Sequence, residues 1–132
     1  MTKALPQIIQ GGMGVAVSNW ELAKAVSQHG GMGVVSGTAI DAVLIRRLES
    51  GDIGGHVRRA LAAFPNQETA QALIEKYFIE GGKAKDVPFS NAPKLLINAS
   101  RHSNDLLIAG AFVEVWLAKE GHDGPVGINF LE

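Results

Sequence analysis

The sequence contains no cysteine among its 132 residues, so disulfides, thiolate metal sites and cysteine nucleophiles are excluded. The absence of cysteine fits a cytoplasmic protein without requiring one, and we expect a cytoplasmic location. The sequence also has no large excess of positive or negative charge: its formal net charge is −1. We therefore expect no basic surface that binds nucleic acid or an anionic membrane.

Long hydrophobic runs are absent as well. The most apolar stretch, Leu106 to Ala118, contains Glu114 and is shorter than the ~20 residues that span a bilayer. Near the N-terminus, Lys3 is followed by only a few apolar residues before Gln7, which is unlike a signal peptide. Hydrophobic residues still make up 46% of the chain and charged residues 19%, so we expect one compact domain with a buried core and no membrane partner.

Glycine is plentiful, with 16 residues, many of them at the expected junctions of strands and helices. Short apolar runs predict strands near residues 5–10, 33–37 and 125–131. Between the first two, Ser18 to Glu21 forms a capping box, and the helix that follows, with Leu22, Ala23 and Val26 on one face, should end before Gly30 and Gly31. A strand, a short helix and a second strand at this spacing predict a βαβ unit and hence a parallel sheet.

Residues 39–102 have a different pattern, which predicts a mainly helical segment. Asp41 and Asn66 are expected to cap two of its helices. The polar stretch 83–93 contains two prolines and predicts a loop, and 94–98 fits a short strand or an extended connection. The positions expected to face inward are Val43, Leu44 and Leu48, then Val57, Leu61 and Phe64, then Ala70, Leu73, Ile74, Tyr77 and Phe78.

The familiar nucleotide and metal motifs are not present. Gly12-Met13-Gly14 suggests a dinucleotide fingerprint, but Val17 occupies the third glycine position and Ser18 caps the helix instead. The chain has no Walker A sequence and no pair of histidines at metal-ligand spacing, so no metal site is predicted.

Two titratable residues need separate explanations. His102, in the stretch from Ser100 to Ser103, is the one histidine that we regard as a site candidate, because His29 and His122 follow helices. Glu114 is the single charge within the apolar helix, and a buried carboxylate is costly unless paired. An ion pair with arginine or lysine, or a position at the rim, is favoured over a catalytic role.

The sequence stretches around the three predicted strands, taken together, resemble those of a known family. The run Pro6 to Met13 resembles the opening strand of the nitronate monooxygenase and 2-nitropropane dioxygenase-like flavoproteins, which are similar to the flavin-dependent enoyl-ACP reductases. Residues 18–33 resemble the family's first helix and the entry to its second strand. Residues 126–130 resemble its third strand, which carries an asparagine at its carboxyl end. The resemblance covers about residues 5–38 and 104–132.

The resemblance implies a (β/α)₈ barrel that binds FMN at the carboxyl ends of its strands. Glycines there would let the backbone approach a planar ring closely. An asparagine amide can donate to and accept from a flavin or its phosphate. The residues that the resemblance places at the flavin are Gln10, Gly11, Gly12 and Met13, largely through their backbone, together with Gly37 and Asn129.

The chain departs from this family in two respects. Residues 39–102 are a helical insertion between the second strand and its following helix, which would lie on the catalytic face as a lid or a subunit contact. A complete barrel takes ~250 residues, so residues 1–132 are expected to be an incomplete, N-terminal part of the barrel domain. The family's catalytic histidine belongs to the missing part, so we expect this piece alone to be inactive.

The function implied is an FMN-dependent oxidoreductase that oxidises alkyl nitronates, its small-molecule substrates, with oxygen. An alternative is an enoyl reductase that uses reduced nicotinamide in a fatty-acid or polyketide pathway. An alternative of another class is a non-enzymatic α/β domain that binds partners or pairs as a homo-oligomer. A small dinucleotide-binding βαβ module is a more distant fourth.

Overall fold

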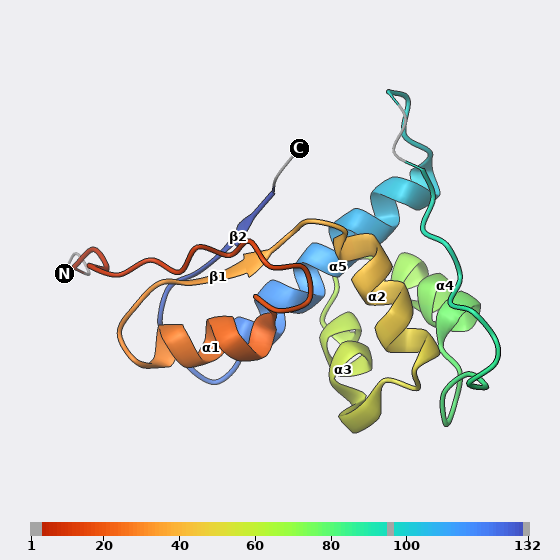
Figure 1. The fold of residues 1–132 in the computed structure, drawn as a ribbon, viewed down its shortest axis with the longest axis horizontal. Helices are drawn as coiled ribbons and strands as arrows, with labels where there is room; N and C mark the ends of the chain where they lie inside the picture. The colour runs from red at the N-terminus through yellow and green to blue at the C-terminus, as the bar shows by residue number, and fades with distance from the viewer. Residues whose placement is uncertain (1–3, 95–96, 131–132) are drawn as a thin grey trace. The chain divides into compact units, whose positions relative to one another are not determined.

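The computed structural model describes residues 4–94 and 97–130 and is of mixed α/β type (Figure 1). Its chain forms two compact units, which we call the sheet unit (Met1–Thr38 and Glu114–Glu132) and the helical unit (Ala39–Val113). The helical unit begins at residue 39, where the sequence predicted the insertion to begin, and continues to Val113 instead of ending at 102. The elements in order are α1 (Trp20–Gln28), β1 (Gly33–Ser36), α2 (Ile40–Glu49), the 3₁₀ turn η1 (Ile53–Gly55), α3 (His56–Ala62), α4 (Gln67–Tyr77), α5 (Arg101–Lys119) and β2 (Val126–Asn129).

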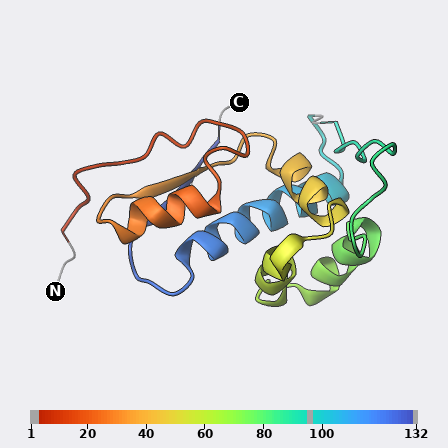
Figure 2. The ribbon, with the colours of Figure 1, turned by 60° about the horizontal axis from the view of Figure 1, so that its bottom comes forward.

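The sheet unit contains the predicted parallel sheet. β1 and β2 pair in parallel, from Gly33 opposite Val126 to Ser36 opposite Asn129. The segment before α1 lies on the other side of β1, where Ile9 forms a parallel bridge with Met32 (Figure 2). The strand predicted at 5–10 is therefore reduced to this bridge, whereas those predicted at 33–37 and 125–131 are present in shortened form. Leu131 lies outside the described residues.

Helix α1 begins one residue later than the sequence suggested. Asn19 is the N-cap, and its side-chain Oδ1 accepts from the Leu22 N–H at 3.0 Å. Ser18 was wrongly predicted as the cap, because its hydroxyl instead accepts from Gln10 Nε2 at 3.2 Å. The predicted inward face was also partly wrong, since Leu22 is 42% exposed. The residues that α1 buries are Trp20, Ala23 and Ser27.

Helix α1 lies close to the start of β1. A Cβ atom placed on Gly33 would lie 1.9 Å from the carbonyl oxygen of Ala23. Since no side chain can occupy that space, glycine at this position lets the helix lie directly against the strand. All four residues of β1 are buried.

The helical unit buries most of the positions that the sequence predicted to face inward. Asn66 caps α4 as expected, with its Oδ1 accepting from the Thr69 N–H at 3.1 Å. Asp41 does not cap α2, which begins at Ile40 with Ala39 as N-cap. Asp41 lies instead in the first turn, where a carboxylate interacts favourably with the helix dipole. The predicted inward positions that are buried are Val43, Leu44, Leu48, Val57, Leu61, Phe64, Ala70, Leu73 and Tyr77, while Ile74 and Phe78 are partly exposed.

Helix α5 begins at Arg101 and not at the predicted Leu106. The sequence signal that we missed is Ser100, whose hydroxyl accepts from the Ser103 N–H at 3.1 Å and caps the helix. Its buried residues recur at helical spacing: Leu106, Ala109, Val113, Leu117 and Ala118. Among the described residues, no helix is long and apolar enough to cross a membrane.

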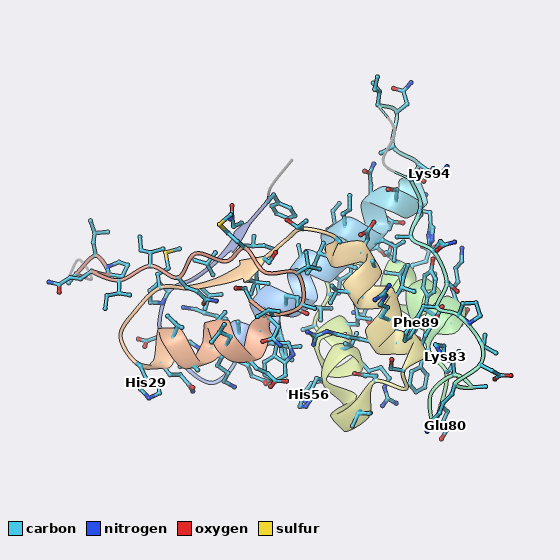
Figure 3. All side chains as sticks on the ribbon, viewed as in Figure 1. His29, His56, Glu80, Lys83, Phe89 and Lys94 are labelled. Atoms are coloured by element: carbon cyan, nitrogen blue, oxygen red, sulfur yellow. The ribbon has the colours of Figure 1, made fainter. Side chains whose placement is uncertain are left out.

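The loop predicted at 83–93 has no helix or strand, and its residues Phe89, labelled in Figure 3, and Ser90 contact residues of α2. The ammonium of Lys83 lies 4.3 Å from the centroid of the Phe89 ring, and the Arg46 guanidinium lies 5.3 Å from it. The Ser90 N–H donates to the buried Glu49 carboxylate at 3.0 Å. Cation–π contacts and this hydrogen bond hold the loop in place. The short strand considered at 94–98 includes two residues outside the described part, and its remaining residues are not in a strand.

Candidate functional site

The carboxyl ends of the parallel segments meet at one edge of the sheet unit. The Gly37 N–H donates to the Asn129 carbonyl at 2.7 Å, which continues the pairing of β1 and β2. The Asn129 side chain donates to the Gly11 carbonyl over a long 3.4 Å, and the Ser36 hydroxyl reaches the Met13 carbonyl at 3.4 Å. The structure therefore brings the predicted residues 10–13, Gly37 and Asn129 together at this edge, which we call the glycine edge.

Gln10 uses its side chain inside the protein. Its Oε1 accepts from the Val34 N–H at 3.0 Å, and its Nε2 donates to the Ser18 hydroxyl at 3.2 Å. One amide thus connects the first segment, β1 and the residue before the α1 cap. Gln10 therefore positions the glycine edge. Its backbone N–H also donates within the protein, to the Met32 carbonyl at 3.0 Å, so only its carbonyl remains for a bound molecule.

The three glycines of this edge have different surroundings. Gly12 has a φ of +63°, and a Cβ there would lie 2.4 Å from Val34 Cγ1. A Cβ on Gly37 would lie 2.6 Å from the Phe130 ring. Both glycines are buried and permit close packing within the protein. Gly11 is exposed, and a Cβ there would meet nothing within 4 Å, so open space lies beside its backbone.

The accessible groups at the glycine edge suit a flat, partly polar ligand. Gly11 and Met13 are exposed, and within the described residues their backbone N–H groups donate no hydrogen bond. The Met13 side chain is 59% exposed and Phe130 is 53% exposed. We did not predict Phe130 as a site residue, although an aromatic residue directly after Asn129 at a strand end was a possible signal.

A second group of polar side chains lies in the helical unit, around His102. The Tyr77 hydroxyl is 2.7 Å from His102 Nε2, and the two rings stack with their centroids 5.9 Å apart. The Lys76 ammonium is 3.4 Å from the same nitrogen. A lysine ammonium can only donate, which favours Nε2 as the acceptor and the Tyr77 hydroxyl as a donor.

Both rings of this pair remain uncharged near neutral pH. Burial lowers the pKa of His102, and the nearby Lys76 lowers it further, while Asp105 partly opposes this. Burial also raises the pKa of Tyr77, and the carboxylate of Glu49 adds to the effect. A neutral imidazole that accepts at Nε2 carries its proton on Nδ1.

This pair predicts a pH dependence of stability. Because the pKa of His102 is lower in the folded chain than its ordinary 6.5, the unfolded chain binds the proton more readily. The contribution of neutral His102 to the free energy of unfolding is therefore fully present above pH 7. It decreases as the pH falls below about 6.5. Urea denaturation between pH 5 and 8 should show this loss, and His102→Gln should flatten it. An unchanged slope in the variant would contradict the assignment.

The other candidates from the sequence have structural partners. His29 Nδ1 donates to the Ala25 carbonyl at 2.7 Å, and His122 Nε2 donates to the Ala118 carbonyl at 2.6 Å, as expected for histidines at helix ends. The carboxylate of Glu114 is buried and accepts from the Trp20 N–H at 2.8 Å. A carboxylate at the N-terminus of α1 is stabilised by the free amides and the helix dipole. This position is structural.

Comparison with known proteins adds no relative. No family model matches the chain, and no curated protein or solved structure matches it. Within the described residues, no group of three or more histidine, aspartate or glutamate side chains could hold a metal ion.

Proposed function

We propose that this chain is the N-terminal part of an FMN-dependent oxidoreductase of the nitronate monooxygenase type and that the glycine edge is its flavin-binding face. The observation that supports this most is the convergence of residues 10–13, Gly37 and Asn129 at the carboxyl ends of parallel segments. Ligands of parallel α/β folds bind at that end of the strands.

The chemistry of the glycine edge fits FMN. The exposed N–H groups of Gly11 and Met13 are free to donate to oxygen or nitrogen acceptors, and open space lies beside the Gly11 backbone for a planar ring. The exposed side chains of Met13 and Phe130 offer apolar contact. FMN would supply the two-electron oxidation that the protein side chains themselves cannot perform. The residues of this chain would bind and orient it.

A barrel also accounts for the uncovered apolar side chains of the sheet unit. Parallel sheets are normally covered on both faces. In the sheet unit, however, large apolar residues are strongly exposed: Leu5, Ile8, Ile9 and Val17. The order of the parallel segments, with residues 8–10 beside β1 and β1 beside β2, is that of consecutive barrel strands. Further strands and helices of the same domain would cover these residues.

The helical unit follows directly after the carboxyl end of β1, because Thr38 ends one unit and Ala39 begins the other. Loops that leave this end of a barrel strand form the active site. We propose that the helical unit acts there as a lid or a subunit contact. Deleting residues 39–100 should then change flavin retention or substrate range, and an unchanged enzyme would count against this role.

The flavin-binding face can be tested with Gly11→Val. The side chain would fill the open space beside the backbone, so flavin retention should weaken about tenfold, which corresponds to ~1.4 kcal/mol. Gln28→Val, at the exposed end of α1 away from the glycine edge, is the matched control and should retain flavin. Flavin released on denaturation is measured per protein, with the melting temperature as a check on folding. Equal flavin content in both variants would contradict the assignment.

Reduction of the flavin by a nitronate, and not by reduced nicotinamide, would separate the monooxygenase from an enoyl reductase.

A further inference from the structure

The helical unit has a cleft that the flavin-binding role does not use. Its volume is about 260 Å³. One wall is a face of α4 and the other is the first two turns of α5. The lining residues are Glu68, Thr69, Ala72, Leu73, Lys76, Arg101, His102 and Asp105. Ligand sites in proteins usually measure ~300–1,000 Å³, so a cleft of this size suits a molecule of few heavy atoms.

We propose that this cleft binds a small carboxylate, with its charged group beside Lys76 and His102 and its short apolar body over Ala72 and Leu73. The site lies wholly within the helical unit and does not depend on the proposed flavin site. Three features of the cleft support the proposal: the ammonium of Lys76, the apolar floor and the state of the His102 ring.

The lining has two cations and two carboxylates, and within the described residues Lys76 is the cation that forms no ion pair. Arg101 lies 3.9 Å from Asp105 on the next turn of the same helix. Lys76 contacts the His102 nitrogen and, at 5.6 Å, the Tyr77 ring, and within the described residues it forms no ion pair. Glu68 precedes it by eight residues, about 12 Å along the helix. A single free ammonium matches a monoanion.

The apolar floor lies between the two charged ends of the α4 face. Leu73 is 2% exposed, and Ala72 stands beside it on the same helix. Residues three and four apart on a helix are neighbours, so the sequence of positions Thr69, Ala72, Leu73 and Lys76 forms one continuous strip. A ligand whose carboxylate reaches Lys76 would therefore lay its hydrocarbon portion on this floor.

His102 would respond directly to such a ligand. The charged or titratable groups around it are Lys76, Tyr77 and Glu68 on α4, and Arg101 and Asp105 on α5. Burial and Lys76 hold the pKa of His102 below 6.5. A carboxylate bound beside Lys76 offsets that repulsion, so binding should raise the pKa of His102. By linkage, the ligand should bind more tightly as the histidine becomes protonated.

The test is an NMR titration of the His102 ring in the intact protein with butyrate at constant ionic strength. Butylammonium, which has the same apolar chain and the opposite charge, is the control ligand. We expect butyrate to raise the pKa of His102 in a saturable manner and butylammonium to leave it unchanged. An absent response to butyrate, or equal responses to both ligands, would overturn the proposal.

Lys76→Gln supplies the matching variant test. Lys76 is exposed, so its replacement should not unfold the chain. The variant should have a higher His102 pKa without ligand, because the repulsion is removed, and its affinity for butyrate should fall at least fivefold. Lys94→Gln, in the loop before α5, is the control and should behave as the unchanged protein (Figure 3). If Lys76→Gln bound butyrate as tightly as the unchanged protein, that result would contradict the proposed site.

Discussion

Gly33→Ala is expected to destabilise the protein by about 3 kcal/mol or more. We expect a larger loss from it than from any other glycine-to-alanine substitution in the sheet unit. The added Cβ would lie 1.9 Å from the Ala23 carbonyl oxygen and 2.7 Å from its carbonyl carbon. These are backbone atoms of α1, so no side-chain rotation can relieve the clash. The helix would have to move away from β1, which would expose the strand that it covers.

Gly11→Ala is the control for this effect. Its Cβ would meet nothing within 4 Å, so the free energy of unfolding should change by less than ~0.5 kcal/mol. Urea denaturation of both variants, followed by circular dichroism, gives the comparison. Similar stabilities for the two alanine variants would show that α1 does not lie against β1 as described.

Glu114→Ala is expected to cost about 2–3 kcal/mol, because it removes the acceptor of a charge-assisted hydrogen bond from a buried position. Glu114 is 3% exposed, and its carboxylate accepts from the Trp20 N–H at the first residue of α1. The substitution leaves that amide without this acceptor and removes a negative charge from the positive end of the helix dipole. Helix α1 should lose protection first, which hydrogen exchange of its amides can measure.

Glu114→Gln separates the hydrogen bond from the packing of the side chain. Glutamine has nearly the same shape and keeps an oxygen acceptor, so we expect roughly half of the loss seen with alanine. Equal losses in the two variants would mean that the negative charge itself carries the effect. A loss with alanine smaller than ~0.5 kcal/mol would contradict the capping role.

The sequence predicted the helices and the parallel order of the sheet unit because these depend on local patterns. Apolar runs and glycine positions define the βαβ spacing, and Asn66 caps α4 as its position indicates. The errors came where tertiary contacts decide. Ser18 and Asn19 are equally good caps by type, and it is the hydrogen bond from Gln10 that occupies the Ser18 hydroxyl.

The grouping of the candidate residues was predictable in part. Strand ends in a parallel sheet share one edge, so Gly37 and Asn129 were placed correctly beside residues 10–13. Which glycine faces open space could not be inferred, because Gly11 and Gly12 differ through the tertiary position of Val34 and the backbone conformation of Gly12. The contact between Tyr77 and His102 joins residues separated by a long loop, and no periodic pattern links them.

The absorbance spectrum of the protein purified from its natural, uninterrupted reading frame tests the flavin-binding role most directly. We expect the yellow bands of a bound flavin, and the released cofactor should be FMN at about one molecule per chain. A folded protein that is colourless and takes up no added FMN would contradict the flavin-binding role of the glycine edge and would favour a non-enzymatic domain that binds partners.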